Sequence, residues 1–356
     1  MEPLVLRLRN HQTFNPFFAE QPGKQRRVVL EKGSRRSSQE GKIEGYSTKW
    51  EQILGTSIQG VERLYQNWLL ITPHGKWVTK ELHHPDQLLW WIKVDRELRE
   101  KGFHEMPLIR TDGRQWLLSS WVEGKRTTYK NRKEITIVAS MLGKFHALGR
   151  GLAVTDSGIH RQHLLHRVHS RFQSFSSLLH SLGKWQEDEY DLHHVASIFH
   201  TYGQEALGRL NQLPLAELCE WDRRTHSITH RDLASHNILL NKEDTPWLID
   251  FETAAYDCQV GDIWQLLSRG LSEQQWNRSV AEEVLAAYEA HRPLTVLEKR
   301  ILVTLLSFPN EFYREALGLI LQKDGYGKNK TLPYLEQLAR DIPCWRSFLK
   351  EIEVAW

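Results

Sequence analysis

The chain has 356 residues, of which 40% are hydrophobic and 26% are charged, and its net charge is +3; these are values of a globular protein long enough for two lobes or two domains. Its three cysteines are widely spaced and odd in number, which indicates neither a disulfide framework nor a cysteine zinc site and favours synthesis in the cytoplasm. Residues 1–20 lack an apolar segment of signal-peptide length, and no run of eighteen apolar residues occurs, so no transmembrane segment is expected.

The first fifty residues carry the excess of positive charge. They hold ten Lys or Arg and five Asp or Glu, whereas the remainder has 37 basic and 39 acidic residues. The basic stretch 24–42 has little to bury and favours a solvated, flexible N-terminal extension. A contact with nucleic acid or another anionic surface is the alternative. Leu4, Leu6 and Leu8 alternate with other residues and fit one strand docked on the body.

Two hairpins and one helix are predicted after residue 50. An apolar run at 69–71, the turn T-P-H-G and a second run ending at Lys80 predict the first hairpin. A helix is expected over 87–101. The second hairpin has strands at 108–109 and 116–124, joined by the turn T-D-G-R.

The following region is predicted to be mostly helical. Apolar residues recur at helical spacing over 133–148. Many histidines lie between 149 and 216, but no cysteine or paired carboxylate joins them, which favours a solvated helix face over a metal site. The part from 270 to 356 also predicts helices, one of which begins with Thr295 and Glu298 as a capping box.

The most informative stretch is 228–252, I-T-H-R-D-L-A-S-H-N-I-L-L-N-K-E-D-T-P-W-L-I-D-F-E. Asn237 follows Asp232 by five residues, and a strand, a turn and a second strand then lead to Asp250. Phosphoryl transfer requires an oriented hydroxyl group and Mg²⁺ held by carboxylate and amide oxygens. The spacing therefore predicts Asp232 as the group that accepts or orients the hydroxyl proton, with Asn237 and Asp250 as metal ligands.

This stretch resembles the catalytic and metal loops of the protein-kinase-like superfamily, which includes protein kinases and the aminoglycoside phosphotransferase and choline kinase group. Asp262 follows Asp250 by only twelve residues, a connection similar to that of the small-molecule branch. The run M-L-G-K-F-H-A-L-G at 141–149 is similar to a signature of the same group, which implies a structural role for His146. The segments at 288–300 and 307–313 resemble the bacterial spore-coat CotS family.

The resemblance implies an α+β, protein-kinase-like two-lobed fold with a small antiparallel β lobe and a larger, mostly helical lobe. The expected parts are the N-terminal extension 1–50, an N-terminal nucleotide-binding lobe 51–122 and a C-terminal catalytic and substrate lobe 123–356. The site residues that it implies are Lys80 for the nucleotide phosphates, the backbone of Ser120 and Val122 at the hinge for adenine, and His230 and Asp262 as supports of the catalytic loop.

The sequence departs from the family pattern in the small lobe. The loop 58–68 has one glycine, Gly60, and no G-x-G-x-x-G, so its backbone is not expected to fold closely over phosphates. Asp95, Glu97 and Glu100 are all available on the helix that should carry the acidic partner of Lys80, and none falls clearly at the expected position.

By resemblance, the function is ATP- and Mg²⁺-dependent phosphoryl transfer to a hydroxyl group of a small molecule. The alternative is a non-catalytic spore-coat or scaffold protein that retains the kinase fold, with spore-coat proteins as partners and the spore coat as its location. Aminoglycoside sites are built from carboxylates, whereas residues 160–180 include Arg161, Arg167 and Arg171 and no acidic residue. This composition favours a neutral or anionic acceptor.

Overall fold

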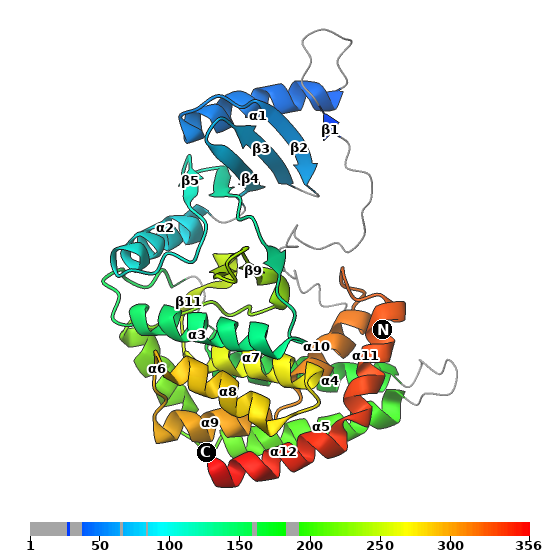
Figure 1. Cartoon of the computed structure of the whole chain (residues 1–356). Helices are drawn as coiled ribbons and strands as arrows, with labels where there is room; N and C mark the ends of the chain where they lie inside the picture. The colour runs from blue at the N-terminus through cyan, green and yellow to red at the C-terminus, as the bar shows by residue number, and fades with distance from the viewer. Residues whose placement is uncertain (1–26, 29–37, 65–66, 83–84, 159–161, 183–191) are drawn as a thin grey trace, which may run out of the picture.

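The computed structural model describes the chain apart from residues 1–26, 29–37, 65–66, 83–84, 159–161 and 183–191. The strand expected around Leu4 to Leu8 and much of the basic stretch 24–42 lie outside the described residues. A small lobe with a β-sheet stands above a larger helical lobe (Figure 1). The predicted α+β, protein-kinase-like two-lobed fold is confirmed.

The small lobe is built on a six-stranded antiparallel sheet with the order β1-β2-β3-β4-β6-β5. The two predicted hairpins are β3 with β4 and β5 with β6, and the first closes at the pair Thr72 and Gly75. Gly75 has a φ of +125°, which is a conformation that glycine adopts without a steric penalty. The strands are β1 (Arg27–Val28), β2 (Gly60–Leu64), β3 (Asn67–Thr72), β4 (Gly75–Glu81), β5 (Ile109–Thr111) and β6 (Trp116–Ser120).

Helix α1 (Ser38–Leu54) covers one face of this sheet (Figure 1). Its Trp50 is fully buried and meets Trp116 of β6 edge to face, with ring centroids 5.2 Å apart. Tyr46 packs against the same small-lobe core. The boundary expected at residue 50 therefore falls inside a helix that belongs to the small lobe.

Helix α2 (Pro85–Glu100) follows the sheet strand β4 but packs on the large lobe. Trp91 stacks on Phe251 with ring centroids 4.1 Å apart, and Trp90 meets Tyr256 edge to face at 5.2 Å. Because Phe251 directly follows Asp250, this helix fixes the segment in which a metal ligand is expected.

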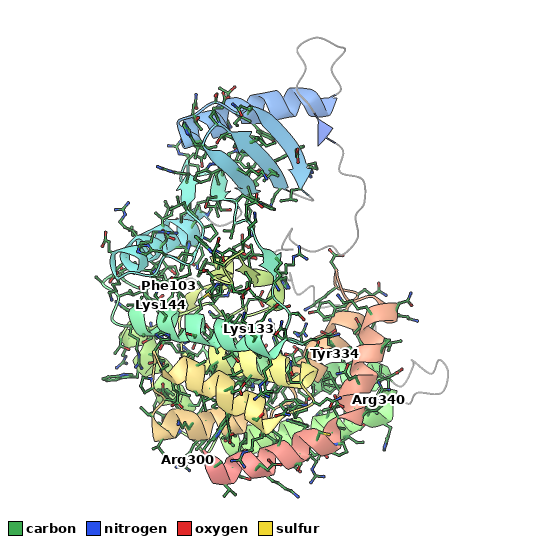
Figure 2. All side chains as sticks on the ribbon, viewed as in Figure 1. Phe103, Lys133, Lys144, Arg300, Tyr334 and Arg340 are labelled. Atoms are coloured by element: carbon green, nitrogen blue, oxygen red, sulfur yellow. The ribbon has the colours of Figure 1, made fainter. Side chains whose placement is uncertain are left out.

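The large lobe has one extensive hydrophobic core shared by its helices. Helix α3 crosses beneath the lobe junction, where Lys144 lies 5.9 Å from the centroid of the Phe103 ring and 2.5 Å from a Glu105 oxygen (Figure 2). The helices are α3 (Arg132–Leu148), α4 (Leu164–Leu182), α5 (Leu192–Leu210), α6 (Leu215–Arg224), α7 (Val260–Glu273), α8 (Arg278–Glu289), α9 (Val296–Leu306), α10 (Asn310–Ile320), α11 (Lys328–Arg340) and α12 (Ile342–Ala355).

The predicted capping box at the start of α9 is confirmed. The Thr295 side chain accepts a hydrogen bond from the Glu298 amide, and the Glu298 side chain accepts one from the Thr295 amide. Across the described residues, no helix is both long and apolar enough to cross a membrane.

Short strands in the large lobe carry the loops of the predicted site. β9 (Ile238–Leu240) pairs with β10 (Pro246–Leu248) and with β7 (Lys125–Arg126), and β8 (Ile228–Thr229) pairs with β11 (Ala255–Tyr256). The predicted order of loop, strand, turn, strand and loop is confirmed. The β8–β11 pair joins the start of the first loop to the end of the second.

Candidate active site

Two loops meet between these short strands: the catalytic loop, residues 230–237, and the metal loop, residues 249–253. The His230 ring nitrogen Nε2 donates to the carbonyl oxygen of Ile249 at 3.0 Å, and Thr253 Oγ1 donates to the carbonyl oxygen of His230 at 2.8 Å. The Ile249 amide donates to the Asn237 carbonyl oxygen at 3.0 Å. Each loop therefore fixes the other through the backbone.

Asp262, in the first turn of α7, supports the catalytic loop from below. It is fully buried and accepts hydrogen bonds from the amides of His230 at 2.6 Å and Arg231 at 2.9 Å. His146 Nε2 lies 3.2 Å from the same carboxylate, and His146 Nδ1 lies 2.7 Å from the Tyr288 hydroxyl. Burial alone would raise the pKa of Asp262, but the hydrogen bonds and nearby charge of His146 and His230 lower it overall.

Helix α7 presents two further polar side chains to the catalytic loop. Gln265 accepts from the Leu233 amide at 3.4 Å and donates to the Arg231 carbonyl at 3.1 Å. Asp262, Gln265 and Arg269 are three, four and seven residues apart, so they lie on one face of the helix. Sequence reasoning missed Gln265 and Arg269, although polar residues at helical spacing in an apolar helix were a signal for them.

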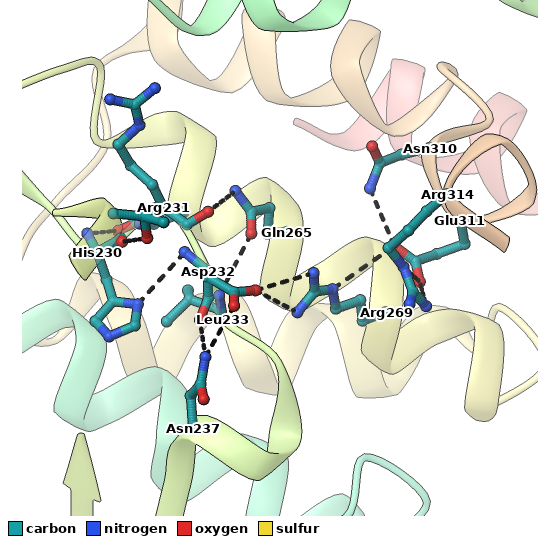
Figure 3. Close-up of polar contacts among 12 residues, drawn as sticks. His230, Arg231, Asp232, Leu233, Asn237, Gln265, Arg269, Asn310, Glu311 and Arg314 are labelled. Atoms are coloured by element: carbon teal, nitrogen blue, oxygen red, sulfur yellow. Dashed lines mark hydrogen bonds and ion pairs between the residues drawn. The ribbon is translucent and has the colours of Figure 1, made fainter. Parts of the chain in front are cut away.

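The carboxylate of Asp232 is held on both of its oxygens (Figure 3). Asn237 Nδ2 donates to Oδ2 at 2.9 Å, and the two terminal nitrogens of Arg269 each lie 3.4 Å from Oδ1. Burial acts to raise the pKa of Asp232, but Arg269, followed by His230 and His236, lowers it below its usual value overall. Asp232 is therefore a carboxylate in its ionised form near neutral pH.

Lys80 of β4 reaches from the small lobe to the metal loop. Its Nζ lies 3.6 Å from Asp250 Oδ1 and also forms a shorter ion pair with Glu252. Burial raises the pKa of Asp250, and Lys80 opposes that rise. Asp250 has a φ of +66°, a left-handed conformation that turns the chain sharply after β10.

The acidic partner of Lys80 does not come from α2, where Asp95, Glu97 and Glu100 were the candidates. Asp95 pairs with Arg99 at 3.0 Å, and Glu97 accepts from the Ala153 amide at 2.8 Å. Within the described part of the chain, none of the three candidates, Glu100 included, forms an ion pair with Lys80, whose acidic partners Glu252 and Asp250 come instead from the metal loop. Sequence reasoning missed Glu252, although its place next to Asp-Phe was a signal.

A pocket of about 350 Å³ lies at the hinge between the lobes. It is lined on one side by Ser120, Val122 and their neighbours, and on the other by residues 241–243 and Trp247. The Ser120 amide already donates to the Leu108 carbonyl at 2.8 Å. The Ser120 amide, one of the backbone groups expected to bind adenine, is therefore already engaged within the small lobe.

The two lobes, with the paired loops between them, define a kinase-like fold. The chain belongs to the phosphotransferase enzyme family, whose model matches residues 58–297. Spore coat protein S of Bacillus subtilis (strain 168) is 25% identical over 266 residues, which are 69% of this chain and 74% of that protein.

Solved structures show the same fold. An aminoglycoside phosphotransferase from Alicyclobacillus acidocaldarius superposes with a TM-score of 0.71 at 17% identity, covering 86% of this chain and 95% of that one. Spectinomycin phosphotransferase in its AMP-bound complex gives 0.58 at 13% identity over 84% and 97% of the two chains. The choline kinase LicA from Streptococcus pneumoniae gives 0.51 at 16% identity over 86% and 99%.

Proposed function

We propose that the protein is an ATP- and Mg²⁺-dependent phosphotransferase that acts on a hydroxyl group of a small molecule. The observation that carries the proposal is the convergence of two pairs, Asp232 with Asn237 and Lys80 with Asp250, at one junction of the catalytic and metal loops. Family membership and the structural likeness to small-molecule kinases support the same chemistry.

The donor atoms at this junction suit Mg²⁺. Asp250 supplies a carboxylate, and Asn237, whose amide nitrogen is turned to Asp232, supplies an amide oxygen on the opposite side. Mg²⁺ prefers hard oxygen ligands of these two kinds, and in such sites it neutralises the charge of the nucleotide phosphates. Lys80 would bind a phosphate oxygen in exchange for its contact with Glu252. Adenine would occupy the hinge pocket beside Ser120 and Val122.

Asp232 would receive the hydroxyl proton. A bond forms between the acceptor oxygen and the γ-phosphorus while the bond from that phosphorus to the bridging oxygen breaks, and ADP leaves. The ionised carboxylate of Asp232, fixed by Asn237, orients the hydroxyl group for this attack. His230 and Asp262 act as positioning residues because they hold the backbone of the loop.

Calorimetric titration of ATP into the full chain, with and without Mg²⁺, tests the proposal. The wild type should bind ATP more tightly with Mg²⁺, and Asp250→Ala should lose this gain. A matched control is Asp244→Asn, since Asp244 is an exposed carboxylate near the same hairpin, paired only with Lys133 in the contacts described. Equal binding by the wild type and Asp250→Ala in the presence of Mg²⁺ would refute the metal site.

The second candidate function is a non-catalytic protein of the spore coat that retains the fold. Two observations favour it: the similarity to a spore coat protein, and the single glycine, Gly60, in the segment 58–68. This segment was expected to be a loop over the phosphates, but most of it forms strand β2 and the start of β3. Under this alternative the protein is made in the cytoplasm and assembles with spore-coat proteins. Absence of Mg²⁺-dependent nucleotide binding, together with recovery of the chain in the coat fraction of spores, would favour this function over the kinase.

A further inference from the structure

Near Asp232, on the side of its Oδ1 atom, lies a group of arginines that has no role in the reaction proposed above. Arg269 of α7 contacts Asp232 directly, and Arg314 of α10 lies beyond it (Figure 3). Arg171 of α4 donates to the side-chain oxygen of Asn310 at the start of α10. We call Arg171, Arg269 and Arg314 the arginine cluster. It joins three helices of the large lobe next to the expected position of the acceptor hydroxyl group.

The positive charge of Arg314 is neutralised within the protein. Its guanidinium group lies 2.6 Å from Glu311 Oε2 and 2.7 Å from Glu315 Oε1. Glu311 also lies 3.8 Å from Arg269 Nε, a longer contact than its bond to Arg314. Both glutamates form their short ion pairs with Arg314. The shortest ion pair of Arg269 is therefore the one with Asp232, the residue that would also contact the acceptor.

Arg171 has no such counter-ion. Among the residues that the structure describes, its polar contact is the hydrogen bond to the neutral amide of Asn310, and no carboxylate lies within ion-pair distance. Burial, together with the neighbouring charges of Arg269, Arg314 and Arg167, lowers the pKa of Arg171 to about 10, although Glu311 opposes the shift. A largely desolvated cation without a counter-ion is costly for a protein to keep.

We infer that the acceptor carries an anionic group, a carboxylate or a phosphate, which binds between Arg171 and Arg269 while its hydroxyl group lies against Asp232. The planar guanidinium fork suits two oxygens of such a group. Binding would supply the missing counter-ion of Arg171 and would draw Arg269 away from Asp232. This inference rests on the proposed function, and it specifies the acceptor class for the same site.

A cationic acceptor does not fit this surface. An ammonium group placed beside Asp232 would lie close to the positive charge of Arg269, whose terminal nitrogens are 3.4 Å from the same carboxylate. Like charges at short range in a partly buried site repel strongly. The cluster therefore selects against choline-like and aminoglycoside-like compounds as well as for anionic ones.

Binding of inorganic phosphate to the full chain, measured by calorimetry without nucleotide, tests the site itself. Arg171→Gln should weaken phosphate binding ~10- to 100-fold, since a charge-assisted contact is lost, and Arg171→Lys should weaken it less. Arg278→Gln is the control, because Arg278 is an exposed arginine paired with Glu282 on α8. Lys80→Met shows how much of the phosphate binds at the nucleotide site instead; the part of the binding that Arg171→Gln removes should persist in Lys80→Met.

The acceptor preference is then tested with Mg²⁺ and ATP by the rate of ADP release. Glycerol 3-phosphate and glycerate should stimulate release more than glycerol or choline, and Arg171→Gln should abolish the difference. Thermal unfolding of each variant checks that it is folded. Equal stimulation by neutral and anionic compounds, or phosphate binding that is insensitive to Arg171→Gln, would overturn the inference. Phosphate binding that depends on Arg171, without any binding of Mg²⁺ and ATP, would support the anion site and refute the proposed kinase function.

Discussion

The Nζ atom of Lys80 lies 3.6 Å from Oδ1 of Asp250, and this contact connects the sheet of the small lobe to the metal loop of the large lobe. Glu252 shares the same lysine. Burial would make Asp250 hard to ionise, and Lys80 is the largest influence that opposes this effect. The lysine therefore favours the ionised form of Asp250, the carboxylate that we propose as a metal ligand, in addition to any contact it makes with phosphate.

Lys80→Met is expected to weaken the binding of Mg²⁺ and ATP by ~10-fold or more at pH 8, because a charge-assisted contact is lost. The loss relative to wild type should be larger at pH 6. Without Lys80 the pKa of Asp250 rises further, and a protonated carboxyl group is a poor ligand for Mg²⁺. Calorimetric titrations at the two pH values provide the measurement.

Lys76→Met is the control for this prediction. Lys76 lies on the same strand, is exposed, and pairs with Glu123 at 3.0 Å. Its substitution should leave nucleotide affinity unchanged at both pH values. A loss in Lys80→Met that is the same at pH 6 and pH 8 would contradict the role given to the lysine in ionising Asp250.

Asp262→Asn is expected to destabilise the fold by ~3 kcal/mol, since one of its buried oxygens becomes a donor that faces backbone donors. The His230 and Arg231 amides would lose part of their support. Urea denaturation measures the change in the free energy of unfolding. Asp244→Asn, at an exposed ion pair, should cost ~0–1 kcal/mol. Similar values for the two variants would show that Asp262 does not hold the loop.

His236, in the catalytic loop, should make the protein sensitive to acid. Burial lowers its pKa from 6.5 to about 3, so below pH 6.5 the unfolded chain binds a proton that the folded chain does not. Stability from this group is complete above pH 6.5 and is lost as the pH falls toward 3. At pH 5 the loss is ~2 kcal/mol.

His236→Gln removes this titration. Urea denaturation at pH 8 and pH 5 should show that the variant loses ~2 kcal/mol less than the wild type over this interval. The difference in the free energy of unfolding between the variant and the wild type at pH 8 serves as the baseline, because the side chains of His236 and of the substituted Gln are both neutral there. Equal losses on acidification would mean that His236 is accessible to protons in the folded state.

Gly143→Ala should separate α3 from α8. An added Cβ would clash with the backbone carbonyl group of Tyr288, whose hydroxyl group lies 2.7 Å from His146 Nδ1. The expected cost is ~1–3 kcal/mol. Gly208→Ala on α5 is a matched control, because nothing lies within 4 Å of its added Cβ. It should stabilise the protein by up to ~1 kcal/mol through helix propensity. Thermal unfolding of both variants separates the destabilising effect of the clash at residue 143 from the stabilising effect of alanine on helix formation at residue 208.

Local patterns in the sequence were sufficient for several elements. The hairpin of β9 and β10 was predicted because two apolar runs flank a polar turn, and it places Asn237 and Asp250 at neighbouring strand ends. The hairpins of the small lobe followed from the same kind of pattern. Helix α1 was missed because its apolar residues, Tyr46 and Trp50 among them, are diluted by polar ones in a basic segment.

The sequence by itself thus determined the order and spacing of Asp232, Asn237 and Asp250, because they lie close together in the chain on short elements with clear periodicity. Only the tertiary structure decided which groups meet them. Glu252 rather than a residue of α2 pairs with Lys80, and Arg269 reaches Asp232. Such contacts depend on how separate helices and strands pack, since the direction of a side chain across an interface is set by burial and charge balance over distant segments.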